Sequence, residues 1–137
     1  MGDFGLNRSQ LKKVFESLRP GDLVCVEWCD ASVGKSSGSG VAIDVPVKSW
    51  GIYVGLFGER AKHIVLAQNS FRYNDGLFDL DYTAIPLSWA LDLVTVAKGH
   101  LVPELAQSLV NSFILGGHRA LNKRTFMQKV KNHARPF

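Results

Sequence analysis

Three sets of side chains have the types that chemistry needs: a lysine in a glycine-rich loop, two cysteines with four histidines, and two neighbouring aspartates. The tripeptide Gly34-Lys35-Ser36 looks like the end of a phosphate-binding loop, whose glycine amides and lysine hold phosphates. Such a loop needs glycine at position 29, where the chain has Cys29, and a helix after the serine. Residues 37–40 start a helix poorly, so the pattern favours a mobile Gly/Ser loop over residues 30–40.

The cysteines are spaced unfavourably for an internal disulfide. Cys25 and Cys29 fall on a predicted strand, where four residues span about 13 Å, beyond the roughly 7 Å between Cα atoms that a disulfide allows. We therefore expect two free thiols, with an intermolecular bridge across paired strands as the alternative. The histidines lack paired spacing and have no cysteine nearby, so we expect no metal site and no cofactor. These histidines are His63, His100, His118 and His133.

Two aspartates, Asp79 and Asp81, would share one face of a strand, as a general acid/base pair does. No histidine or lysine is obviously aimed at them. A solvated strand face is therefore the simpler interpretation.

Two short segments resemble the strand pattern of the NlpC/P60 and LRAT cysteine peptidases and acyltransferases. They are Pro-Gly-Asp-Leu-Val at 20–24 and Trp-Gly-Ile-Tyr-Val-Gly at 50–55, with His63 after them, within about 45 residues. The resemblance implies a cysteine thiolate beside a histidine base. The catalytic histidine of that superfamily immediately precedes the strand matching 50–55, where this chain has Ser49. No cysteine precedes Pro20 or follows Cys29, so we expect no enzymatic activity.

A wider pattern over residues 19–97 resembles small proteins of hyperthermophilic archaea and their viruses, most closely those of a spherical virus. The matching segments are 19–30, 49–55, 62–68 and 81–89. The resemblance implies the host cytoplasm or the virion as location, without secretion, and implies no activity. Since disulfides do occur inside hyperthermophile cells, the expectation of free thiols depends on geometry alone.

The elements that must carry these side chains indicate a single α+β domain of 137 residues. Leu11, Val14, Phe15 and Leu18 recur at helical spacing after an N-cap at Asn7 or Ser9, and Pro20 ends that helix. Short alternating runs then predict strands at 22–29, 41–45, 49–57, 61–67, 77–85 and 91–97, with one helical turn at 86–89. This order is typical of a small antiparallel SH3-like or Sm-like β-barrel.

The hairpin over residues 49–67 is the predicted centre of the sheet. Trp50, Ile52, Val54 and Leu56 fall on one face at period two, which predicts Trp50 in the core and Tyr53 at the surface. After it, residues 68–76 indicate a polar turn with exposed Phe71 and Tyr73.

The C-terminal part is predicted to be a basic helical hairpin. Leu105, Leu109 and Phe113 form an apolar stripe on a helix over 104–115, and a second helix follows at about 118–134. We therefore divide the chain into residues 1–99, the N-terminal helix and barrel, and residues 100–137, a helical appendage.

Charge is distributed unevenly along the chain. Residues 98–137 carry seven Lys or Arg against Glu104 alone, a net charge of +6, whereas residues 1–97 sum to −2. The imbalance predicts sequence-tolerant binding of DNA or RNA, with basic side chains on phosphates and aromatic rings on bases. The residues expected to take part are Arg119, Lys123, Arg124, Lys129, Lys131, Arg135, Tyr53 and Tyr73.

Two other interpretations remain open for this chain. In the first, the chain is a protein-interaction or virion structural component that forms a homo-oligomer, with the stripe of helix 104–115 as the contact. Alternatively, the basic tail is only a solvated helix face. No run approaches the roughly 20 apolar residues of a membrane span, so we expect no membrane partner.

Overall fold

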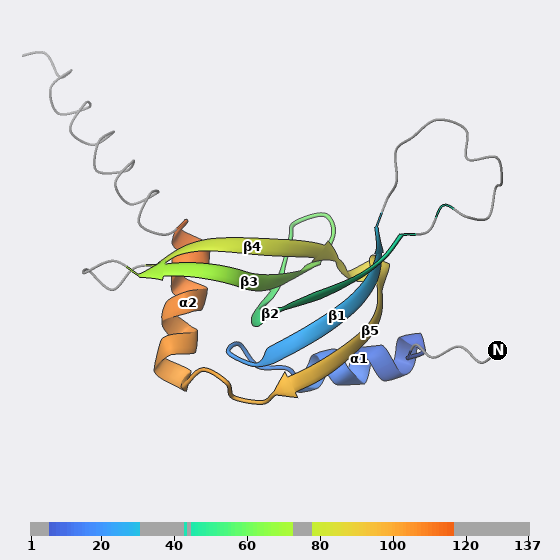
Figure 1. Cartoon of the computed structure of the whole chain (residues 1–137), viewed down its shortest axis with the longest axis horizontal. Helices are drawn as coiled ribbons and strands as arrows, with labels where there is room; N and C mark the ends of the chain where they lie inside the picture. Colours follow the sequence, from blue (N-terminus) through green and yellow to red (C-terminus); the bar gives the residue numbers. More distant parts are fainter. Residues whose placement is uncertain (1–5, 31–42, 44, 73–77, 117–137) are drawn as a thin grey trace, which may run out of the picture.

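The computed structural model describes residues 6–30, 43, 45–72 and 78–116 (Figure 1). In this described part of the chain, five antiparallel strands form one open sheet in the order β4-β3-β2-β1-β5, with one helix before the strands and one after them. The predicted α+β class and the single helical turn before the last strand are confirmed. The elements are α1 (Arg8–Ser17), β1 (Leu23–Asp30), β2 (Val45–Phe57), β3 (His63–Arg72), β4 (Phe78–Pro86), the 3₁₀ helix η1 (Leu87–Trp89), β5 (Ala90–Ala97) and α2 (Pro103–Leu115).

The first helix begins as its sequence predicts. Asn7 Oδ1 accepts a hydrogen bond from the Gln10 N–H at 2.8 Å, and Gln10 Oε1 accepts one from the Asn7 N–H at 3.0 Å. This reciprocal capping box satisfies N–H groups that the first turn leaves unpaired. The apolar stripe then buries Leu11 and Phe15 against the sheet.

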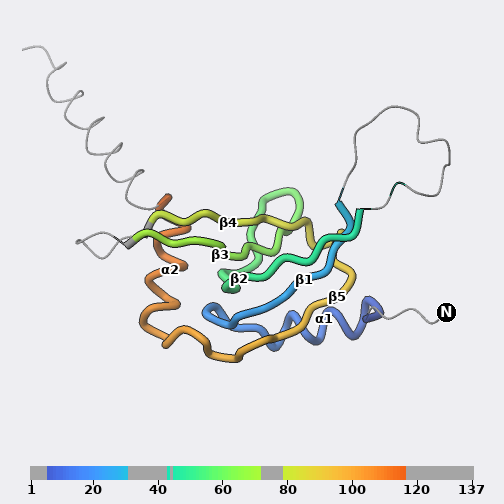
Figure 2. Tube along the Cα trace, viewed as in Figure 1, coloured from blue at the N-terminus to red at the C-terminus, as the bar shows by residue number. Residues whose placement is uncertain are grey.

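The two helices cover opposite faces of the sheet. Along β3, Ile64 and Leu66 pack in the cluster that contains α1, whereas Val65 and Ala67 pack in the cluster with α2. Alternate side chains of a strand point to opposite faces, so β3 is buried on both sides. Figure 2 shows α1 beside β1 and β5, and α2 at the other end of the sheet, beside the ends of β3 and β4. Each helix therefore covers only part of its face.

The prediction that Trp50 lies in the core is wrong, because 55% of its surface is exposed. Ile52 and Val54, on the same face of β2, pack in the α2 cluster, but Trp50 is outside it. Leu56 leaves this face, because a register shift between Tyr53 and Gly55 breaks the alternation, and it packs with the α1 cluster instead.

The prediction that Tyr53 is exposed is also wrong. Its side chain is 6% exposed and belongs to the α1 cluster, and this burial raises the pKa of the Tyr53 phenol. Its backbone N–H donates to the Asp22 carbonyl at 2.8 Å, and its carbonyl accepts from the Gly21 N–H at 3.0 Å. Both faces of β2 are covered at this point, so neither side of the strand leaves a ring at the surface.

Other strand limits differ from the sequence patterns. Ile43, predicted in a short strand at 41–45, lies in a turn, and β2 begins at Val45. The predicted turn at 68–76 is instead strand as far as Arg72, although Phe71 is exposed as expected. Asp30, predicted to begin the Gly/Ser loop, is the last residue of β1. The rest of that loop, Tyr73 and the predicted helix at 118–134 lie outside the described residues.

The helix over 104–115 is confirmed as α2, with Pro103 in its first turn and Gly116 at its C-cap. Its stripe of Leu105, Leu109 and Phe113 packs in the cluster shared with β2, β3 and β4. This stripe, which the sequence suggested as a contact surface, therefore packs largely within the chain.

Candidate interaction surface

The residues predicted to bind nucleic acid are not brought together in the described structure. Tyr53 is buried, and Tyr73 lies outside the described residues. So do the basic residues Arg119, Lys123, Arg124, Lys129, Lys131 and Arg135. Their proposed role therefore depends on sequence and charge, and the only aromatic ring of the predicted turn with a described position is that of the exposed Phe71.

The residues suggesting cysteine-enzyme chemistry are far apart. Cys25 pairs with Trp50, whereas His63 pairs with Phe57, seven residues further along β2 and so about 23 Å away at the usual rise of a strand. Ser49, at the position of the superfamily's histidine, accepts a hydrogen bond from Trp28 Nε1 at 3.0 Å. His63 Nδ1 lies 2.9 Å from the Ala61 carbonyl. The described geometry thus keeps the His63 imidazole away from the Cys25 thiol.

The described residues also show no group of three or more His, Cys, Asp or Glu that could hold a metal ion. Cys25 and Cys29 are both free and partly buried. Neither helix in the described part of the chain has the length and apolar character that crossing a bilayer requires.

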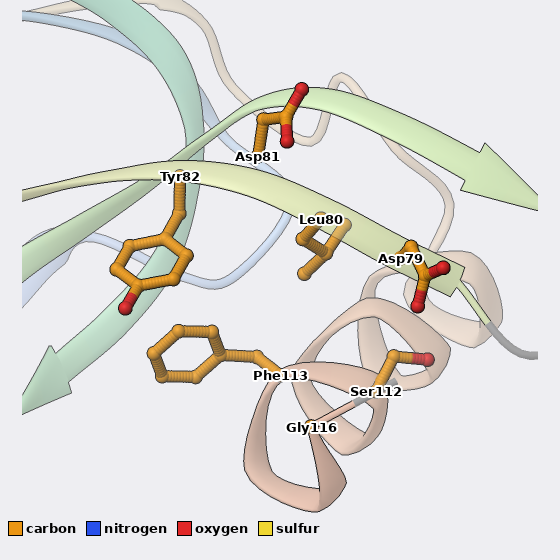
Figure 3. A pocket seen from close by; sticks show the side chains of 7 residues that line it. All are labelled: Asp79, Leu80, Asp81, Tyr82, Ser112, Phe113 and Gly116. Carbon is orange, nitrogen blue, oxygen red and sulfur yellow. The ribbon is translucent and has the colours of Figure 1, made fainter. Parts of the chain in front are cut away.

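A groove of about 530 Å³ lies between β4 and α2 (Figure 3). Tyr82 meets Phe113 edge-on, with ring centroids 5.1 Å apart, and forms an aromatic wall. The Asp79 carboxylate points toward the helix near Ser112, whereas the Asp81 carboxylate points away from it. The two aspartates that the sequence paired on one face therefore do not converge as an acid/base pair.

The groove has the size of a small-ligand site, but its polar groups do not form a reactive set. Ser112 is buried, and both Ser112 and Asp79 already have interaction partners. A carboxylate beside aromatic rings suits a cationic group.

A second feature is an apolar area on the α2 side of the sheet that α2 does not cover. Cys25 of β1 lies directly between Trp50 of β2 and Val94 of β5, so these three side chains form a row across three strands. Trp50 and Val94 are each 55% exposed, and Cys25 between them is partly buried. We call Trp50, Cys25 and Val94 the open patch.

Charged residues border the open patch on one side. Two residues along β1 from Cys25, Glu27 pairs with Lys48 of β2 and with Asp92 of β5. The patch exists because α2 packs against β2 and β4 and leaves β1 and β5 uncovered on this face. The sequence did not reveal the patch. Alternation shows that Trp50 and Val94 lie on apolar faces of their strands, but it does not show how much of each face a distant helix covers.

Comparison of the chain with protein-family models, with curated proteins and with solved structures finds no match.

Proposed function

We propose that this chain is a non-enzymatic protein-interaction module that binds a protein partner through the open patch. The observation that supports the proposal is the row of exposed Trp50, partly buried Cys25 and exposed Val94, which is apolar and bordered by charge. Exposed apolar surface costs about 25 cal/mol per Å² relative to burial, so a contiguous patch of this kind is typical of a contact surface.

The composition of the patch favours a protein as its partner. Tryptophan is enriched among the residues that carry most of the binding energy at protein interfaces, and apolar centres surrounded by polar rims are the usual anatomy of such interfaces. The patch lies on rigid strands paired on both sides at β1, so little ordering is needed on binding.

The separation of Cys25 from His63 supports the non-enzymatic part of the proposal. A thiolate nucleophile needs a base within hydrogen-bond reach. The cross-strand neighbours of Cys25 are instead the apolar residues Trp50 and Val94.

Site-specific photo-crosslinking tests the proposal. A benzoylphenylalanine in place of Trp50 should form covalent adducts with protein in the cells that produce the chain. The same group in place of Lys13, an exposed residue of α1, should not. Equal adduct yields from the two positions would show that the patch is not a contact surface.

We also propose that the sheet is a partly open SH3-like or Sm-like barrel. The pairing of β5 with β1 and the single 3₁₀ turn η1 before β5 support it. Nuclear Overhauser contacts between backbone amides of β4 and β5 would demonstrate closure, and their absence would leave an open sheet.

A second candidate function is nucleic-acid binding by the basic C-terminal part. The net charge of +6 over residues 98–137 favours it, because phosphate contacts from lysine and arginine dominate sequence-tolerant affinity. The two functions use different parts of the chain and do not exclude one another.

A further inference from the structure

At the β1–β5 end of the sheet, two surfaces are open to a second copy of the chain: the outer edge of β5 and the open patch. The edge of β5 has no described neighbour, but it is poorly suited to a further strand. Its pairing with β1 shifts register twice, and the Leu93 N–H is already bonded to Asp92 Oδ1 at 2.8 Å. Bulges and occupied N–H groups are features that protect edge strands against edge-to-edge association. The open patch is therefore the better candidate.

The open patch has the arrangement that a two-fold contact needs. Cys25 is its midpoint, with a large side chain, Trp50, on one flank and a small one, Val94, on the other. In the charged row beside it, Lys48 is basic on the Trp50 flank and Asp92 is acidic on the Val94 flank. Turning such a surface over about an axis along β1 sets each flank against the opposite flank, which matches large with small and Lys48 with Asp92. Glu27 lies on β1 between these two residues, so it faces Glu27 of the second copy at the axis, with a Lys48 on each side of the pair to offset the like charge.

We propose that the partner on the open patch is a second copy of this chain, packed face to face about a two-fold axis along β1. This proposal rests on the proposed function. Trp50 packs on Val94 of the second copy, and Cys25 faces Cys25 of the second copy at the axis. Lys48 meets Asp92 of the second copy, and this contact occurs twice because the interface is isologous. The two sheets then stack at about 10 Å, as in a β-sandwich.

The small size of the patch limits the strength of the dimer. Three strands and about five residues along each cover about 14 Å by 16 Å, or about 220 Å² per copy, which is well below the roughly 800 Å² per partner of a standard interface. We therefore expect a weak, reversible dimer with a dissociation constant of about 0.1–1 mM, dependent mainly on Trp50.

The charge pattern allows a test that uses complementary variants. In a Lys48→Glu homodimer both flank contacts become acidic against acidic, and in an Asp92→Lys homodimer both become basic against basic. Each variant alone should therefore dimerise about tenfold or more weakly than the wild type. When the two variants are mixed, both flank contacts again join opposite charges, so heterodimers should form with nearly wild-type affinity.

Sedimentation equilibrium measures each dissociation constant, and native mass spectrometry with one variant labelled with ¹⁵N identifies the heterodimer. The matched controls are Lys13→Glu and Glu16→Lys on α1, which make the same kinds of charge change at exposed positions on the other face and should change nothing. Recovery on mixing also shows that both variants are folded. A mixture that stays as weak as its components would overturn the two-fold arrangement.

The crosslinking at position 50 separates this inference from the proposed function. Adducts of twice 15.1 kDa, together with a wild-type dimer, support the second copy. If the wild type stays monomeric at about 1 mM while position 50 still forms adducts of another mass, the inference is wrong and the protein-interaction module stands. If position 50 forms no adducts above the Lys13 control, both are wrong.

Discussion

Lys98 Nζ lies 2.9 Å from Asp22 Oδ2, and this ion pair ties the residue after β5 to the residue before β1. Asp22 is 1% exposed and also accepts hydrogen bonds from the backbone N–H groups of Gly99, at 2.8 Å, and Arg19, at 2.9 Å. Burial alone raises the pKa of the Asp22 carboxyl, but the bonds from Gly99, Arg19 and Lys98 together outweigh it and hold the pKa below its usual value. One carboxylate thus joins the end of α1, the start of β1 and the end of β5.

This carboxylate should make stability depend on acid pH. Because its folded-state pKa is lowered, Asp22 stabilises the fold fully above about pH 3.9, and the contribution disappears as the pH falls through the folded-state pKa. Asp22→Asn should lower the free energy of unfolding by about 2–4 kcal/mol at pH 7, since buried donors lose their charged acceptor. Urea unfolding from pH 7 to pH 2 measures the difference, which should shrink at the acid end. Asp81→Asn, at an exposed position, is the control.

Replacement of Trp50 should barely change the stability of the monomer. Its side chain is 55% exposed, so Trp50→Ala removes little buried surface and should cost less than about 1 kcal/mol. Leu66 is fully buried between strands, and Leu66→Ala should cost about 2–5 kcal/mol through the cavity it leaves. Urea unfolding at low protein concentration, where self-association is negligible, measures both. A Trp50→Ala loss as large as that of Leu66→Ala would show that Trp50 is covered after all.

The contrast between these residues shows what the sequence could predict. The N-cap at Asn7, one of two candidates, the stripe of Leu11 and Phe15, and the helix that ends before Gly116 depend on neighbours in the chain, and all three were predictable. The position of Trp50 depends on how far α2, more than fifty residues later, extends over the sheet. Alternation shows which side chains share an apolar face of a strand, but it does not show which part of that face a helix covers.

The bulge in β2 is a second feature that the sequence did not reveal. It moves Leu56 to the α1 face after Ile52 and Val54 have faced α2, so a strand that looks one-sided is buried on both sides. Tyr53 was expected at the surface because the alternation in the sequence marks only the opposite face of this strand as apolar. The candidate surface could not be predicted, because its row of Trp50, Cys25 and Val94 depends on strand register between distant segments.

The thiol of Cys25 should react slowly. Burial is the main cause that raises its pKa, and the nearby carboxylates of Glu27 and Asp92 add to this against the opposite effect of Lys48. Since the thiolate is the reactive form, alkylation at pH 7 should be slower than that of an unstructured cysteine peptide, and the rate should continue to rise above pH 9. The measurement uses a Cys29→Ser variant and a maleimide reagent at low protein concentration. Fast labelling at neutral pH would instead indicate an activated thiol and favour the cysteine-enzyme interpretation.

The basic C-terminal part should bind nucleic acid weakly and with strong salt dependence, if the charge of +6 over residues 98–137 serves this purpose. Basic side chains spread over this many positions cannot all reach one backbone, so we expect about three or four phosphate contacts and a slope of log K against log salt near −3 to −4. Replacing Lys123, Arg124 and Lys131 together with alanine should flatten the slope by about two to three units.

Fluorescence anisotropy with duplex and single-stranded DNA and with RNA, from about 20 mM to 200 mM salt, measures these slopes. Trp50→Ala is the matched control, because it removes the largest side chain of the open patch and leaves the basic residues unchanged, so it should alter self-association and not the slope. A wild type that binds no nucleic acid at about 20 mM salt, where screening is weakest, excludes this second function. The basic residues then serve solubility or an acidic protein partner, and the proposal for the open patch is unaffected because it depends on other residues.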